Sequence, residues 1–202
     1  NPTGTWLEAS TIEAFLTQLP DQVVAVLDEA YFEYMQPKLR PDSRRLLEQH
    51  ENLVVTRTFS KVHGLAGLRI GYGLTSAVIA DLLNRVRQPF NANSPAMAAA
   101  IAALDDYNHV KESVVANTAG LQQLESGLTE LGLKTLPSQA NFLAFHLARE
   151  AEPINQALLR AGVILRPLAS YAMPEHLRVT IGTQQENQRF LEALRQVLES
   201  GV

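Results

Sequence analysis

The sequence contains no cysteine among its 202 residues, and this absence excludes disulfide bonds and thiolate metal sites. It also has no stretch that approaches the roughly 18–20 uninterrupted apolar residues of a membrane-spanning helix. Acidic residues number 21 and basic residues 17, so there is no positive excess of the kind that binds nucleic acid. Because the first residues also do not form a basic and then apolar leader, we expect a cytoplasmic protein without a membrane or nucleic-acid partner.

Hydrophobic residues make up 46% of the chain and charged residues 19%, which is typical of a globular protein with a substantial core. The length suits one medium domain, or one domain and a smaller lobe. The opening Asn1-Pro2-Thr3-Gly4 has the pattern of an internal turn, since proline fixes φ and glycine accepts a positive φ. We therefore expect the chain to be an incomplete portion of a longer protein.

Apolar runs alternate with helical patterns in the first half of the chain. The predicted strands are residues 23–27, 53–56 and 69–74, and the predicted helices are residues 10–19, residues 78–88 and a helix that opens at Asn93-Ser94-Pro95. We expect Ser10 to cap the first helix and Pro20 to end it. The continuous run 23–27 predicts a strand that is buried on both faces. Together these patterns indicate an α/β domain with a mostly parallel sheet covered by helices.

The second half changes character. From Val110 the apolar positions recur at intervals of three, four and seven, which predicts a long amphipathic helix that Gly132 ends. The strands expected after it are residues 133–136, 142–146, 163–166 and 177–181, with helices near residues 154–161 and 190–198. We interpret the chain as part of a large domain (1–95), connecting helices (96–131) and a small α+β domain (132–202).

Polar residues gather where the apolar runs end. Asp28 follows the run 23–27 directly, and Lys61 follows Thr58 and Ser60 after the next run. Arg69 lies beyond a loop that contains two glycines. Taken singly, Asp28 fits a turn or a cap and Lys61 fits a solvated surface lysine. Ligands of open α/β sheets bind at the carboxyl ends of the strands, however, so the combination predicts a binding site there.

These residue types suit a phosphorylated aromatic cofactor. An aspartate can hold a pyridine nitrogen in its protonated form, which makes the ring a better electron acceptor. A lysine can form a Schiff base with a carbonyl group and can later transfer a proton. Serine hydroxyls and the planar guanidinium of arginine bind phosphate. By contrast, His63 has no second histidine or cysteine nearby at ligand spacing, so we expect no metal site.

Four motifs resemble, in order, those of pyridoxal-phosphate (PLP) enzymes with the aspartate-aminotransferase-like fold. They are Asn1-Pro2-Thr3-Gly4, Asp28-Glu29-Ala30-Tyr31, Ser60-Lys61 and Gly67-Leu68-Arg69-Ile70-Gly71. The order Thr58–Lys61 and then Leu65–Arg69 is most similar to the histidinol-phosphate aminotransferases, as are the segments 91–100, 139–142 and 177–182. The resemblance covers nearly the whole chain.

The resemblance implies a role for each matching residue. Lys61 would carry PLP as a Schiff base and would be the catalytic acid and base. Asp28 would pair with the pyridine nitrogen. The other implied cofactor contacts are Asn1 and Tyr31 to the phenolic oxygen, and Thr58, Ser60 and Arg69 to the phosphate. The implied reaction is transamination between histidinol phosphate and the glutamate/2-oxoglutarate pair in histidine biosynthesis, by a homodimer that acts on small molecules.

Substrate recognition is implied for Arg178, which resembles the arginine that binds the anionic group of the substrate. That anion is either the phosphate of histidinol phosphate or a carboxylate of glutamate, and a guanidinium suits both. Arg166 either assists Arg178 or is a surface charge at the end of a strand.

The family also has an N-terminal arm and about half of its large domain ahead of the Asn-Pro-x-Gly motif. That part supplies a glycine-containing turn for the phosphate, an aromatic residue that stacks on the ring and a tyrosine that reaches the neighbouring subunit. This chain contains none of them, so we expect it to be inactive alone. Two alternatives have a similar frame: a threonine-phosphate decarboxylase, and the PLP-binding sensor domain of an aminotransferase-like transcription regulator.

Overall fold

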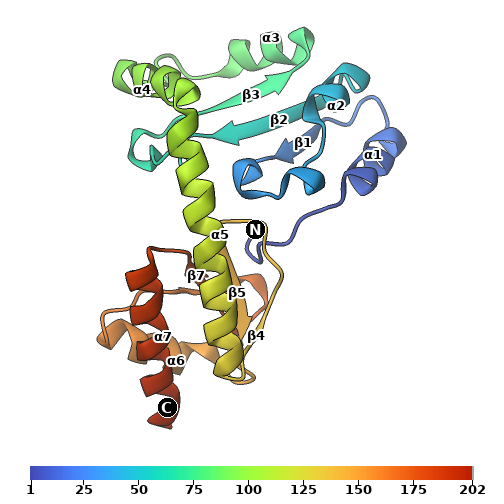
Figure 1. Ribbon diagram of the computed structural model, residues 1–202. Helices are drawn as coiled ribbons and strands as arrows, with labels where there is room; N and C mark the ends of the chain where they lie inside the picture. Colours follow the sequence, from blue (N-terminus) through green and yellow to red (C-terminus); the bar gives the residue numbers. More distant parts are fainter. Residues whose placement is uncertain (202) are drawn as a thin grey trace. The chain divides into compact units, whose positions relative to one another are not determined.

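The computed structural model describes residues 1–201, and the chain separates into two compact units (Figure 1). Unit 1 consists of Asn1–Trp6 and Ser113–Val202, and unit 2 is Leu7–Glu112. The division falls inside the long helix α5 (Tyr107–Glu130). No helix within residues 1–201 is long and apolar enough to cross a membrane. Each unit combines helices with a β-sheet, which confirms the predicted α/β class.

Unit 2 contains a three-stranded sheet with the order β1-β2-β3. β1 and β2 are parallel and β3 is antiparallel to β2, so the parallel character expected of the large sheet is carried by β1 and β2. The elements, with η for a 3-10 helix, are α1 (Ala9–Gln18), β1 (Ala25–Asp28), η1 (Phe32–Tyr34), η2 (Pro37–Leu39), α2 (Ser43–Gln49), β2 (Leu53–Thr58), η3 (Ala66–Leu68), β3 (Gly71–Thr75), α3 (Ala77–Val86) and α4 (Ser94–Asp105).

Side-chain caps define where several of these helices begin. The predicted opening of α4 is confirmed, since the Asn93 side chain accepts a hydrogen bond from the backbone N of Ala96 at 2.8 Å. The prediction that Ser10 caps α1 was wrong. The helix begins at Ala9, two residues earlier than a cap at Ser10 would give, and the backbone carbonyl of Glu8 accepts hydrogen bonds from the N atoms of Thr11 and Ile12. The backbone alone therefore starts α1, without a side-chain cap.

The core of unit 2 lies on one face of β1 and β2. The buried residues that form it come from α1, α2 and the two parallel strands: Ile12, Leu16, Ala25, Leu46, Leu53 and Val55. The prediction that residues 23–27 are buried on both faces was wrong, because Val24 is 54% exposed and Val26 is 64% exposed. β1 pairs with β2 alone, and the helices α1 and α2 cover only the face that carries Ala25. Within residues 1–201, the opposite face of β1 is left exposed at Val24 and Val26.

Unit 1 contains a four-stranded antiparallel sheet with the order β4-β5-β7-β6. Its elements beyond α5 are β4 (Lys134–Thr135), β5 (Phe142–His146), α6 (Ala151–Arg160), β6 (Arg166–Pro167), η4 (Ala169–Tyr171), β7 (His176–Thr180) and α7 (Gln184–Glu199). The long amphipathic helix is confirmed, and Gly132 follows its end with the positive φ of +74° that favours glycine. The strand predicted at 163–166 is reduced to β6, because the residues that pair with β7 are Arg166 and Pro167, while Val163 and Leu165 pack into the core ahead of it.

One face of this sheet packs against helices, while the other carries the buried Phe142 and Ala144 beside polar and charged side chains such as Arg178. Leu143, Phe145, Leu177 and Val179 alternate toward the core, where Leu124 and Leu128 of α5 and Phe190 and Leu194 of α7 meet them. α5 approaches the segment before α7 closely at Gly120. A Cβ added there would lie 2.5 Å from Cγ2 of Ile181 and 2.9 Å from Nδ2 of Asn187, so this glycine permits the contact.

Candidate active site

Two polar segments follow the parallel strands β1 and β2, at the edge where both strands end. Asp28 is the last residue of β1 and pairs in register with Thr56, while Thr58 is the last residue of β2. The Asp28 side chain is exposed, and its Oδ1 accepts a 3.0 Å hydrogen bond from the backbone N of Ala30. Asp28 and Thr58 therefore lie at the edge where ligands bind in α/β sheets.

The loop that carries Lys61 is fastened at its base. Phe59 is buried, its backbone N donates to the carbonyl O of Ile70 at 3.2 Å, and its carbonyl O accepts from the backbone N of Leu65 at 2.9 Å. His109 adds a contact from α5, because its Nε2 lies 2.9 Å from the carbonyl O of Val62. The loop is thus held at both ends and in its middle.

The Lys61 amine lies over the ring of Tyr31, at 5.2 Å from the ring centroid. This cation–π geometry brings together the two motifs that follow β1 and β2. The backbone around Lys61 is fixed by two further hydrogen bonds: Ser60 N donates to Thr58 Oγ1 at 3.1 Å, and Gly64 N donates to Lys61 O at 2.9 Å. Both hydroxyls predicted to bind phosphate therefore stand within three residues of the lysine.

Arg69 ends the same loop in a conformation that non-glycine residues seldom adopt. Its φ is +54°, in the left-handed region, and it follows η3. Its Nη1 donates to the carbonyl O of Ala66 at 2.8 Å, which turns the guanidinium back along the loop. Residues with a strained backbone of this kind cluster at functional sites, so the conformation of Arg69 supports its choice as a candidate site residue.

His63 lies two residues from Lys61 in a partly buried position. Burial lowers the pKa of His63 below its ordinary value; His109 acts in the same direction, and Glu33 opposes them. The ring packs 5.1 Å from that of Phe59, and Nδ1 is buried without a hydrogen-bond partner within residues 1–201. Burial therefore disfavours the charged form of this imidazole.

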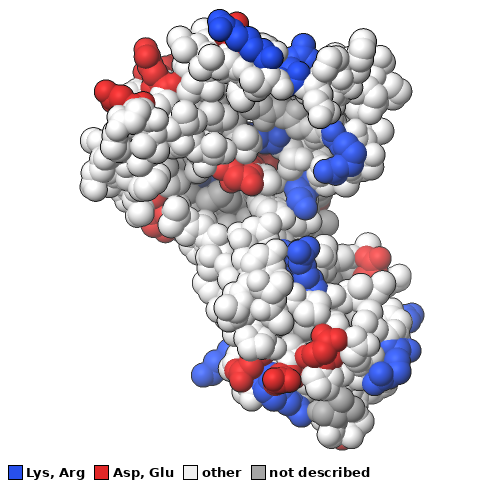
Figure 2. All heavy atoms as spheres, turned by 180° about the vertical axis from the view of Figure 1, so that it is seen from behind, with Lys and Arg blue, Asp and Glu red and all other residues white. Residues whose placement is uncertain are grey.

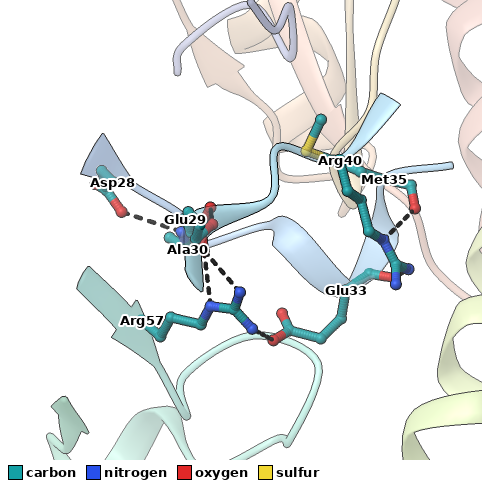
Figure 3. Close-up of polar contacts among 8 residues, drawn as sticks. Asp28, Glu29, Ala30, Glu33, Met35, Arg40 and Arg57 are labelled. Carbon is teal, nitrogen blue, oxygen red and sulfur yellow. Dashed lines mark hydrogen bonds and ion pairs between the residues drawn. The ribbon is translucent and has the colours of Figure 1, made fainter. Parts of the chain in front are cut away.

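An ion pair with a buried carboxylate was missed from the sequence. Glu29 follows Asp28, and its Oε2 accepts hydrogen bonds from Nε and Nη2 of Arg57 at 2.8 and 2.7 Å. Figure 3 shows Arg57 reaching from β2 to Glu29 and also to Glu33, whose Oε1 lies 3.6 Å from Nη1. An arginine inside the apolar strand 53–58 was the signal that could have revealed the pair.

Unit 1 holds the other predicted site residues. Arg166 and Arg178 are directly paired neighbours on β6 and β7, and the guanidinium of Arg178 lies over the ring of Phe142, 4.2 Å from its centroid. Arg178 Nη1 donates to Asn1 Oδ1 at 2.9 Å, and Arg166 Nη2 donates to the Tyr171 hydroxyl at 3.2 Å. Two guanidinium groups and the first residue of the chain thus gather on one part of this unit.

The predicted residues therefore form two groups. The group in unit 2 is Asp28, Tyr31, Thr58, Ser60, Lys61 and Arg69, and the group in unit 1 is Asn1, Arg166 and Arg178. The face drawn in Figure 2 shows charged side chains of both signs, scattered among broad uncharged areas. No group of three or more His, Cys, Asp or Glu side chains in the described part of the chain could hold a metal ion. The chemistry available is that of an amine, hydroxyls, carboxylates and guanidinium groups.

The family model for aminotransferase class I and II matches residues 1–194. The chain belongs to this family of aminotransferases. It is 58% identical over 198 residues to histidinol-phosphate aminotransferase 2 of Pseudomonas fluorescens, which covers 98% of this chain and 54% of that protein. It is 53% identical over 200 residues to histidinol-phosphate aminotransferase of Methylobacillus flagellatus, with 99% and 54% covered. The chain therefore spans about half the length of these relatives.

Solved structures agree with this placement. The fold matches histidinol-phosphate aminotransferase from Sinorhizobium meliloti, solved in complex with pyridoxal-5'-phosphate, at a TM-score of 0.94 and 32% identity. That match covers 100% of this chain and 56% of the other. L-threonine-O-3-phosphate decarboxylase from Porphyromonas gingivalis matches at a TM-score of 0.84 and 22% identity, over 98% of this chain and 62% of that one. The second match shows a shared fold only.

Proposed function

We propose that the protein containing this chain is a PLP-dependent aminotransferase that acts between histidinol phosphate and the glutamate/2-oxoglutarate pair, in histidine biosynthesis. The observation that carries the proposal is the Lys61 amine, held over Tyr31 on a fastened loop between two hydroxyls and an arginine. Identities above 50% to relatives named histidinol-phosphate aminotransferase support the choice of substrate.

The side chains of unit 2 fit the chemistry of PLP. Oδ1 of Asp28 is engaged by the backbone, and its Oδ2 has no hydrogen-bond partner within residues 1–201, so the exposed carboxylate has capacity for a protonated ring nitrogen. Thr58 and Ser60 provide hydroxyls and Arg69 a guanidinium for a phosphate group. When bound, PLP supplies a ring that accepts electrons from the carbon attached to the substrate nitrogen.

The Lys61 amine would condense with the carbonyl group of the cofactor, with the oxygen lost as water, and, once released, would move a proton between two carbon atoms. The Lys61 amine lies 5.2 Å from the centroid of the Tyr31 ring, and the Tyr31 hydroxyl would bind the phenolic oxygen of the cofactor. The same role is proposed for Asn1. The negative charge of Asp28 would keep the pyridine nitrogen of the cofactor protonated. The loop hydrogen bonds would hold Lys61 in place while these groups act.

Arg178 and Arg166 would bind the substrate anion. They are register partners on neighbouring strands, so both guanidinium groups can approach one phosphate or carboxylate. We expect Arg178→Ala to weaken the use of histidinol phosphate and of glutamate together, measured as a rise in KM for each. Loss for only one substrate would mean that Arg166 binds the other, and Arg166→Ala tests this directly.

The central test is chemical labelling of the lysine. The full-length protein is loaded with PLP, reduced with borohydride and digested, and the labelled peptide is identified by mass spectrometry. We expect the label on Lys61, and we expect Lys61→Ala to abolish both label and transamination. Lys111→Ala, on the exposed surface of α5, is the matched control and should change neither. A label on another lysine would reject the proposed site.

Product analysis separates the proposal from its rivals. Glutamate formed from 2-oxoglutarate in the presence of histidinol phosphate supports the transaminase. Carbon dioxide released from threonine phosphate would instead indicate a decarboxylase, for which the fold match alone gives no support. A protein that binds PLP but converts neither substrate would favour the sensor domain of a transcription regulator.

The proposal extends to the whole protein. We expect a cytoplasmic homodimer whose large domain includes residues 1–95, whose connecting helices are 96–131 and whose small domain is 132–202. Sedimentation of the full-length protein tests the dimer. The 202-residue chain alone should not transaminate, and normal turnover by a preparation of that mass would contradict this expectation.

A further inference from the structure

We propose that Glu29 and Arg57 are a positioning pair, which holds the turn bearing Asp28 and Tyr31 in fixed register with the strand end that leads to Lys61. This inference rests on the proposed function, because it concerns how the residues assigned to the cofactor are held. Neither side chain belongs to the group assigned to PLP or substrate. The pair would act on the cofactor site indirectly, by holding the backbone segments that carry Asp28, Tyr31 and Lys61.

The Glu29 carboxylate is fully engaged on the protein side. Only 4% of its side chain is exposed, its Oε2 binds Nε and Nη2 of Arg57, and its Oε1 accepts a hydrogen bond from the Ser43 hydroxyl at the start of α2. The backbone N of Glu29 also donates to Thr56 O at 2.9 Å, next to Arg57 in the strand. A buried carboxylate with three donors has one stable orientation, because any rotation leaves a buried charge unpaired.

Arg57 extends the hold to the residues after Tyr31. Its Nη1 lies 3.6 Å from Glu33 Oε1, and its guanidinium stacks over the Phe32 ring at 3.7 Å from the centroid. Both residues belong to η1, and Tyr31 is the residue that precedes this turn. Arg40 holds the same turn from its other end, since its Nη2 donates to Glu33 O at 2.9 Å. The orientation of Tyr31 against Lys61 thus depends on a turn that Arg57 anchors.

Alternation along the strands separates the pair from the site. Successive residues of a strand point to opposite faces, so Arg57 faces away from Thr56 and Thr58. The same alternation turns Glu29 away from Asp28 at the end of β1. The pair therefore lies on the side of the sheet that α2 covers, where it reaches Ser43, and leaves Asp28 exposed. It can fix both strand ends without occupying the space in which a cofactor would bind.

The experiment uses the full-length protein with Glu29→Gln, Arg57→Lys and the double variant. Arg44→Gln is the matched control, because Arg44 is 90% exposed and pairs with Glu48 at 3.3 Å on the surface of α2. Three quantities are measured: the dissociation constant of PLP, the pH midpoint of the absorbance of the lysine-bound cofactor, and the thermal unfolding of the cofactor-free protein. Arg57→Lys keeps the charge and one hydrogen bond, so it serves if Glu29→Gln fails to fold.

We expect Glu29→Gln to weaken PLP binding by roughly 10-fold or more, the order of loss found when groups that orient metal ligands are removed. The pH midpoint should shift as well, because Tyr31 no longer holds the Lys61 amine in one place. Arg57→Lys should show a smaller change of the same kind, and Arg44→Gln should show none. If the two residues act as a unit, the double variant should lose no more PLP affinity than the single variant that binds PLP more weakly.

Two results would overturn the inference. One is a folded Glu29→Gln or Arg57→Lys protein whose PLP affinity and pH midpoint equal those of the parent. The other is a double variant whose losses are the product of the single losses, which would mean that the residues act separately. A parent protein that binds no PLP, or that is labelled at a lysine other than Lys61, would reject the proposed function itself. The two failures are therefore distinguishable.

Discussion

The two units of the chain differ in how far they bury their own apolar residues. Unit 1 has a core of fifteen buried hydrophobic residues drawn from its sheet and from α5, α6 and α7. The corresponding core of unit 2 has six. Most of the exposed large hydrophobic residues are in unit 2, and those of unit 1 are Val115, Leu159, Ile164 and Tyr171. Unit 1 thus buries most of its large apolar side chains within its own core, whereas unit 2 leaves many of them exposed.

The difference shows that an apolar pattern predicts which faces are buried in the full-length domain, and not which are buried in this chain. Val26 on β1, Val78 and Val86 on α3 and Ile101 on α4 have exposed fractions of 64, 69, 78 and 67%. These positions have the spacing and residue types of buried faces, yet nothing within residues 1–201 covers them. We expect the remaining part of the full-length protein to cover this surface, since large uncovered apolar patches are rare on soluble proteins.

The largest effect should come from truncating a buried leucine in unit 1. Leu128 on α5 is fully buried, and Leu128→Ala should lower the free energy of unfolding by about 2–5 kcal/mol because it leaves a cavity. The matched change in unit 2 is Leu82→Ala on α3, where the side chain is 52% exposed and the expected loss is about 0.5 kcal/mol. Chemical denaturation measures both, and equal losses would contradict the comparison.

Hydrogen exchange of the 202-residue chain should separate the units next. We expect the amides of β5 and β7 to be protected roughly 100-fold more than those of β1 and β2, which corresponds to about 2.7 kcal/mol in the free energy of opening. β5 is buried along most of its length, while β1 is an edge strand with one open face. Mass spectrometry of exchanged peptides gives the measurement. Uniform protection across both sheets would show that unit 2 is as stable as unit 1.

Much of this architecture could be predicted from the sequence, because local patterns determine most elements. The apolar runs placed β2 and β5, the Asn93 cap placed α4, and the motifs around Lys61 indicated the family that the comparisons confirm. The burial of β1 could not be predicted, since burial depends on which neighbours are present. The Glu29–Arg57 pair was missed for a related reason: the partners are 28 residues apart, and a charge next to a strand end is usually solvated.

The close contact at Gly120 offers a smaller effect within unit 1. Gly120→Ala raises helix propensity by about 1 kcal/mol, but its methyl group would collide with Ile181 and Asn187, so we expect a net loss of about 1–2 kcal/mol. Ser126→Ala on the exposed side of the same helix is the control and should change stability little. A Gly120→Ala variant that is more stable than the parent would show that α5 can move away.

The smallest effect should be a pH dependence of unit 1. Burial lowers the pKa of His176 below the ordinary value of about 6.5, His146 adds to the effect, and Glu175 opposes it. The fold therefore prefers the neutral ring, and the unfolded chain binds more protons at acidic pH. This contribution to stability is present above the ordinary pKa and is lost as the pH falls through the folded value. His176→Gln should flatten the fall in melting temperature below about pH 6.5, and an unchanged profile would reject the assignment.

The left-handed backbone of Arg69 has a consequence for laboratory evolution. A non-glycine residue at a φ of +54° costs on the order of 1 kcal/mol, and glycine would remove that cost. A library of the full-length protein ranked by heat resistance should therefore enrich Arg69→Gly. The same library ranked by retention of the phosphorylated cofactor should lose this variant, because the substitution that removes the strain also removes the guanidinium group. Opposite rankings at this one position would mark Arg69 as a residue whose chemistry outweighs its conformational cost.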